Sequence, residues 1–202
     1  MASNNLADEI PSIETLEERF LFIEDKTLRI NISLTFQYII FLIAVSDQEN
    51  TEKSTVGSTI HKSMIIHTAS IIEGCLHYCL QTYIETNQTT EADALGFDKK
   101  LMHHKDVYET ETDGMLCTAF QVREPRTYSN ELQLLNLIRA CEKAGILDKE
   151  TYKSAEKIRK LRNKVHLAGL GEIDAKYTKA NTQDIFKDAA DILNRIEALL
   201  LF

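Results

Sequence analysis

Apolar residues recur at steps of three and four positions through long stretches of this chain. The clearest run lies in segment 58–86 and consists of Ile65, Ala69, Ile72, Leu76, Cys79 and Tyr83. This spacing places the residues on one side of an α-helix. The 202 residues include only two prolines and seven glycines, so few positions force a helix to end. The pattern predicts a mostly helical protein with a long, partly buried helix over 58–86.

At least one further helix is expected before this one. Ser12 is a suitable N-cap for a helical pattern over 13–47, which polar residues interrupt near 26–31 to give one long or two shorter helices. The polar segment 46–58 is expected to form a loop. Segment 30–45 is very apolar, but its length of about 16 residues falls short of the roughly 20 that span a bilayer. A buried core helix is therefore expected, and no membrane span.

Three helices are expected in the second half, over 130–144, 149–168 and 182–200. Gly145 is expected to end the first in a left-handed conformation, and Asp148 to cap the second, which ends at Gly169 and Gly171. The residues expected to face inward are Leu132, Leu135, Ile138 and Cys141 in the first helix, and Ile185, Ala189, Ile192, Ile196 and Leu199 in the last.

Segment 87–130 lacks helical periodicity. A turn signal at Asp113-Gly114 lies between short runs that contain Val, Tyr, Leu, Cys and Phe, which indicates a small β-hairpin or an irregular insertion. The predicted fold class is all-α: an antiparallel bundle of four or five main helices, with this insertion between the second and the third. One domain is expected over 1–202, with the insertion inside it.

Charge and cysteine content limit the classes of function. The net charge of −8 argues against a general nucleic-acid coat, although the segment 153–164 is locally basic. The cysteines Cys75, Cys79, Cys117 and Cys141 lack the spacing of a zinc site. The first residues lack the basic start and apolar run of a signal peptide. A reducing, cytoplasmic location is expected.

Four residues that can act together in catalysis are Arg159, Arg162, Asn163 and His166. At 100° per residue, position 166 lies within about 20° of position 159 and about 40° of positions 162 and 163, so one helix face carries all four. Imidazole is a general acid or base near neutral pH, and arginine binds phosphate through two hydrogen bonds. The simpler alternative is that these cations compensate the dipole at a helix C-terminus.

These residues resemble the motif of the HEPN family, whose helical bundles carry an arginine, four to six intervening residues and a histidine, commonly with a polar residue after the arginine. Arg159 and His166 enclose six residues, but Lys160 follows the arginine. Arg162 is followed by the polar Asn163 and leaves three residues before His166. The motif is divided between two arginines, and either can be the partner of His166.

The resemblance implies a metal-independent endoribonuclease of the toxin or antiviral-defence type, without a cofactor. It also implies a homodimer in which two motif helices form one composite site. RNA is the expected substrate, and an antitoxin or another regulatory protein is an expected partner. Some family members have lost activity and serve as binding modules. A noncatalytic module that binds RNA or protein is therefore the alternative.

In the catalytic hypothesis, His166 removes a proton from a ribose 2′-hydroxyl, and the oxyanion attacks the adjacent phosphorus to leave a 2′,3′-cyclic phosphate. Arg162 lies one turn from His166 and is expected to approach it directly. Arg159 lies about 10.5 Å away along the axis and is better placed for substrate or a facing protomer. Asn163 is expected to orient the imidazole or to contact phosphate.

Other polar residues receive supporting or structural interpretations. Lys160 and Lys164 are expected to bind substrate. Glu73 and His77 lie four residues apart off the apolar stripe, which favours a local hydrogen bond or ion pair, or support of His166 from a facing helix. His103-His104 and Asp106 are expected to be loop residues. They are not expected to form a metal site, because adjacent residues of a strand point to opposite faces and no further residue has the spacing of a ligand.

Overall fold

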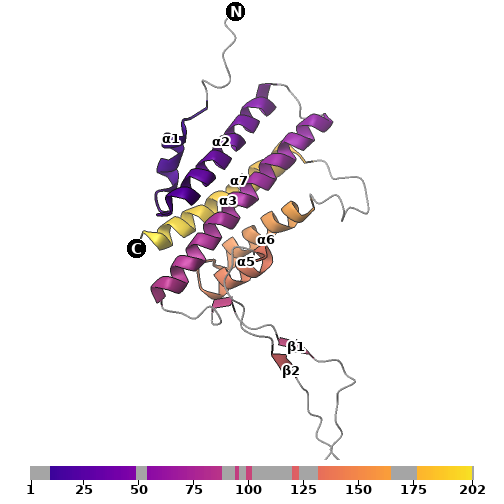
Figure 1. The fold of residues 1–202 in the computed structure, drawn as a ribbon. Helices are drawn as coiled ribbons and strands as arrows, with labels where there is room; N and C mark the ends of the chain where they lie inside the picture. The colour runs from indigo at the N-terminus through magenta and orange to yellow at the C-terminus, as the bar shows by residue number, and fades with distance from the viewer. Residues whose placement is uncertain are drawn as a thin grey trace, which may run out of the picture.

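The computed structural model describes residues 10–48, 54–87, 94–95, 99–101, 120–122, 132–164 and 177–201. The elements in chain order are helix α1 (Ile13–Glu17), the 3-10 helix η2 (Glu18–Phe20), α2 (Lys26–Gln48), α3 (Thr55–Asn87), strands β1 (Lys99–Leu101) and β2 (Phe120–Val122), and helices α5 (Leu134–Lys143), α6 (Lys149–Asn163) and α7 (Lys179–Leu200). The long helices pack side by side (Figure 1). The predicted all-α bundle is confirmed.

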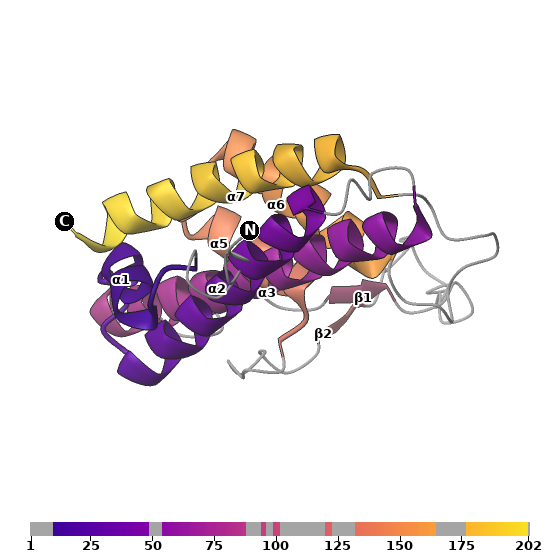
Figure 2. The ribbon, with the colours of Figure 1, turned by 90° about the horizontal axis from the view of Figure 1, so that it is seen from above.

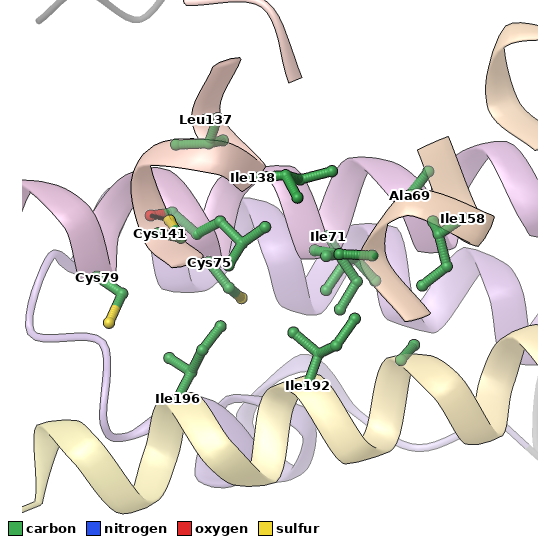
Figure 3. Packing of buried hydrophobic residues seen from close by; sticks show 14 of the residues in the cluster. Ala69, Ile71, Cys75, Cys79, Leu137, Ile138, Cys141, Ile158, Ile192 and Ile196 are labelled. Atoms are coloured by element: carbon green, nitrogen blue, oxygen red, sulfur yellow. Dashed lines mark hydrogen bonds between the residues drawn. The ribbon is translucent and has the colours of Figure 1, made fainter. Parts of the chain in front are cut away.

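Helix α3 is the central element of this bundle. It packs against α2, α5, α6 and α7, so every other long helix contacts it. The predicted stripe on α3 is confirmed from Ile65 to Cys79, because each of its members in that range is buried. Figure 3 shows residues of α3, α5 and α7 converging in one core, with Cys75, Ile138 and Ile192 near its middle.

Three cysteines lie inside this core, as the sequence predicts for small buried residues. Burial raises the pKa of Cys75 to about 12 and that of Cys79 to about 11. Cys141 is also buried, and its thiol donates a weak hydrogen bond to the backbone oxygen of Leu76 at 3.8 Å. Protonated, enclosed thiols are poor nucleophiles, so these residues act as packing residues.

The first two helices differ from the prediction in where they divide. Ser12 caps α1 as expected, and its hydroxyl accepts a hydrogen bond from the Thr15 backbone at 3.3 Å. The break comes at 21–25, before the predicted 26–31, and α2 begins at Lys26. Helix α2 is continuous through the polar residues at 26–31, and one of them, Arg29, donates a hydrogen bond back to the Ile23 carbonyl in the break at 2.7 Å.

Helix α2 lies at the edge of the bundle and is not the enclosed core helix that the sequence predicts. It packs against α3 and buries Ile32, Ile39 and Leu42, whereas Leu34 and Tyr38 are 47% and 44% exposed. Segment Lys26–Asp47 is long and apolar enough to cross a membrane, with a mean hydropathy of 1.7, and 22% of its most apolar stretch is buried. One such helix is weak evidence for a membrane span.

The second half of the bundle agrees with the predicted pattern, with exceptions at helix ends. Ile185, Ala189, Ile192 and Ile196 are buried, but Leu199 is 46% exposed, and the neighbouring Leu200 packs against the core instead. In α5 the buried residues are Leu134, Leu137 and Ala140, together with the predicted Ile138 and Cys141, while Leu135 and the preceding Leu132 are half-buried. The helix begins at Leu134, four residues later than expected, and its buried face includes Leu134 and Leu137 in place of Leu132 and Leu135.

The insertion contains a two-stranded antiparallel sheet. Lys99 pairs with Val122, and Leu101 pairs with Phe120. These paired strands agree with a β-hairpin, which is one of the two forms expected for 87–130. The expected turn at Asp113-Gly114 lies outside the described residues, as do His103, His104 and Asp106.

The turn between α5 and α6 is fixed by backbone geometry and by α7. Gly145 has a φ of +77°, as predicted, and Asp148 accepts hydrogen bonds from the backbones of Glu150 and Thr151 at 3.1 and 2.9 Å. Arg195 of α7 donates to the carbonyls of Ile146 and Gly145 at 2.7 and 3.0 Å, and its other nitrogen lies 2.8 Å from Asp148. The start of α6 is therefore tied to both neighbouring helices.

Gly145→Ala is expected to lower the free energy of unfolding by about 1 kcal/mol, because a left-handed conformation strains any residue with a Cβ. No atom lies within 4 Å of the added carbon, so the loss reports backbone conformation alone. Urea denaturation measures this loss of stability.

Gly74→Ala in α3 is the matched control. The added Cβ lies 3.6 Å from Leu28, an ordinary van der Waals distance, and the higher helix propensity of alanine is expected to raise the free energy of unfolding by about 0.5–1 kcal/mol. Equal effects would contradict the assignment.

Candidate functional site

The predicted catalytic segment forms the last turns of α6. The helix is held to the bundle by Thr151, Ala155 and Ile158, which are buried at 8%, 1% and 1% exposure. This buried face directs Arg159 and Arg162 to the helix sides, where both are half-buried. The packing of α6 on α3, α5 and α7 therefore decides which groups the arginines meet.

Arg162 makes the contact that joins α6 to α3. Its Nη1 donates to Glu73 Oε1 at 3.3 Å, and its Nη2 lies 3.1 Å from Glu73 Oε2. The side chains are 32% and 23% exposed, so the pair lies at the margin of the core. A guanidinium held by two carboxylate oxygens has a fixed orientation. Both residues are candidate site residues in the sequence. Their contact was not predicted, because they lie 89 positions apart.

Arg159 is bound within its own helix. Its Nε and Nη2 donate to the two carboxylate oxygens of Glu156 at 2.7 and 2.9 Å. These hydrogen bonds are the main reason that the pKa of Glu156 is lowered and that of Arg159 is raised. Glu156 is not among the residues that the sequence pattern predicts for the site, although its position three residues before Arg159 is a spacing at which helical side chains meet. Arg159 does not join Arg162 on one carboxylate.

His77 is half-buried on α3, one turn after Glu73. Burial lowers the pKa of His77, and the Glu73 carboxylate raises it by a smaller amount. Glu73 therefore acts on two groups at once, the Arg162 guanidinium of α6 and the His77 imidazole of its own helix. The predicted Glu73–His77 interaction is present as an electrostatic one.

The remaining residues of the predicted site lie at and beyond the end of α6. Asn163 is the last helical residue, and Lys164 is the C-cap, with its backbone N–H donating to the Lys160 carbonyl at 3.2 Å. Lys160, Asn163 and Lys164 are exposed. The prediction of a helix to residue 168 is wrong, since α6 ends at Asn163. His166 lies outside the described residues, as do Gly169 and Gly171.

A second polar contact that the sequence did not predict joins α6 to α7. Lys157 Nζ lies 2.7 Å from Asp188 Oδ2, and the Ser154 hydroxyl donates to Asp188 Oδ1 at 3.0 Å. Two of the basic residues in 153–164 are thus paired with acids of other helices, so the local positive charge is partly neutralised by tertiary contacts. Within the ranges that the structure describes, no group of three or more His, Cys, Asp or Glu residues could hold a metal ion.

A comparison of the chain with protein-family models, with curated proteins and with solved structures found no match.

Replacing Glu73 and Arg162 by alanine, singly and together, is expected to give a coupling of about 1 kcal/mol in the free energy of unfolding, because two hydrogen bonds join part-buried charged groups. The same double-mutant cycle on Glu150 and Lys153, which are 80% and 59% exposed, is the control and should give about 0.3 kcal/mol. A Glu73–Arg162 coupling no larger than this control contradicts a structural role for the pair.

Glu73→Gln is expected to lower the pKa of His77 further, because it removes the carboxylate that favours the imidazolium. Titration of the His77 ring by NMR measures this shift. The pKa of His77 in the folded protein lies below the ordinary 6.5. The contribution of neutral His77 to stability is therefore complete above pH 6.5 and is lost as the pH falls through the folded pKa. Glu85→Gln, three turns along α3, serves as the control. A raised His77 pKa in Glu73→Gln would overturn this account.

Proposed function

We propose that this protein is a HEPN-like, metal-independent endoribonuclease. The observation that supports the proposal is the fixed guanidinium of Arg162 at the C-terminal end of α6, held by Glu73 and next to the exposed Asn163 and Lys164. A phosphate-binding group with a preset orientation costs little reorganisation when substrate arrives. Arg162 also lies four positions before His166 in the sequence.

In this proposal His166 removes the proton of a ribose 2′-hydroxyl. The oxyanion attacks the adjacent phosphorus, the bond to the 5′-oxygen breaks, and the leaving oxygen takes up a proton, so that the products are a 2′,3′-cyclic phosphate and a 5′-hydroxyl. Arg162 stabilises the charge that develops on the phosphoryl oxygens. Lys160 and Lys164 hold neighbouring phosphates, and Asn163 orients the reacting groups.

The choice between the two arginines follows from their partners. Arg159 is held by Glu156 through 2.7 and 2.9 Å hydrogen bonds and is 17% exposed, whereas Arg162 is 32% exposed, so more of its guanidinium can reach a phosphate while Glu73 keeps its orientation. We therefore assign the catalytic role to Arg162. In a homodimer, which the composite site of the family requires, Arg159 would support the helix surface that meets the partner.

The second candidate is a noncatalytic helical module that binds RNA or a protein such as an antitoxin. The observation that favours it is that both guanidinium groups are already paired with carboxylates of this chain. A paired arginine contributes to packing without any substrate. In this alternative the exposed Lys160, Asn163 and Lys164 form the contact surface.

Purified full-length protein is expected to cleave single-stranded RNA in the presence of EDTA and to leave 2′,3′-cyclic phosphate ends, measured by gel electrophoresis and mass spectrometry. His166→Ala and Arg162→Ala should each reduce the rate about 100-fold or more, the scale of a lost general base or charge-stabilising group. Arg159→Ala should reduce it less.

His67→Ala and Arg19→Ala are the matched controls, because the His67 ring packs edge-on against Tyr38 of α2 with ring centroids 4.9 Å apart and Arg19 is exposed on η2. Both should cleave at the wild-type rate. Cleavage that survives His166→Ala, or RNA binding without cleavage by the wild type, counts against the nuclease; the latter favours the noncatalytic module.

A further inference from the structure

A cavity of about 560 Å³ lies on a different part of the molecule from the α6 site. Its lining residues come from the α1–η2 segment and the turn after it, and from α2, α3 and α7, with none from the described residues of α5 or α6. Figure 2 shows α2 and α7 along two sides of this part of the bundle, with α1 near the C-terminal end of α7. Cavities of 300–1,000 Å³ are typical of small-molecule sites.

The walls of this cavity are apolar and rich in aromatic rings. Phe20, Phe22, Phe36 and Phe186 all line it. Phe20 packs edge-on against Phe36 with ring centroids 5.9 Å apart, which fixes one end of the cavity. On the α3 side, the Thr68 hydroxyl donates to the Met64 carbonyl at 2.8 Å and is not free to bind a ligand. An occupant in contact with these walls must itself be apolar.

Two opposite charges line the same cavity without pairing. Arg19 and Glu197 both belong to its lining, and within the described part of the chain neither side chain makes a hydrogen bond or an ion pair. Arg19 is exposed, and Asn194 adds an amide to the same lining. A ligand with only one charge would meet a repelling group at this site, whereas a zwitterionic head complements both.

We propose that this cavity binds a single-chain zwitterionic amphiphile. Its hydrocarbon chain lies among the phenylalanines, its anionic group binds Arg19, and its cationic group binds Glu197. The shared chemistry is that of a lysophospholipid, with a phosphate and a quaternary ammonium on one head group. This site is independent of the RNA-directed function proposed for α6, and loss of one does not imply loss of the other.

Isothermal titration with dodecylphosphocholine, kept below its critical micelle concentration, tests this site. Saturable binding of one molecule per chain is expected. Arg19→Gln and Glu197→Gln should each weaken it about threefold to tenfold, the size of an exposed charge-assisted contact. Neither should change the binding of dodecyl maltoside, which has the same tail and a neutral head. Arg139→Gln, outside the cavity, removes the same charge and should change neither.

Ala190→Phe is expected to abolish the binding of both amphiphiles, because Ala190 is exposed and lines the cavity, so the added ring fills it. A thermal melt checks that this variant folds. The two glutamine variants alter surface groups and test the head-group contacts separately. Absence of binding by the wild type overturns the proposal, as does equal loss of dodecyl maltoside binding in both charge variants. Cosedimentation with phosphatidylcholine vesicles that persists in Ala190→Phe would instead assign the apolar surface to a bilayer.

Discussion

The burial of α3 is the constraint on which the rest of the structure depends. This helix has 33 residues, and its buried positions run from Gly57 to Leu80. An isolated helix gains little stability from its own hydrogen bonds, so α3 is stable because α2, α5, α6 and α7 cover its apolar residues. Each covering helix is in turn placed by the part of α3 that it meets.

Polar contacts at both ends of α6 determine its position along the bundle, which apolar packing alone does not specify. At its start, Asp148 caps the helix and pairs with Arg195 of α7. At its end, Arg162 pairs with Glu73 of α3. Apolar contacts are nondirectional, whereas these pairs require particular atoms to meet. The orientation of the candidate site is therefore set by the same contacts that anchor its helix.

The two faces of the bundle differ in chemistry. The α6 face carries charged residues that are largely matched by partners within the chain, while the side formed by α2 and α7 carries an apolar cavity beside Arg19 and Glu197, whose side chains have no partner among the described residues. Matched charges favour stability and orientation, and unmatched charges beside an apolar cavity favour a ligand. Local pairing, and not the total charge of −8, distinguishes the two faces.

The sequence by itself determined the helices, their caps at Ser12 and Asp148, the left-handed Gly145 and most of the buried stripe on α3, because these depend on local spacing and local hydrogen bonds. It misplaced the break before α2, the start of α5 and the end of α6, because local signals are weakest at helix boundaries. It also selected Glu73 and Arg162 without pairing them. Only the tertiary structure decided that pairing, and also the edge position of α2, because a contact between residues 89 positions apart depends on how helices pack and leaves no local signal in the chain.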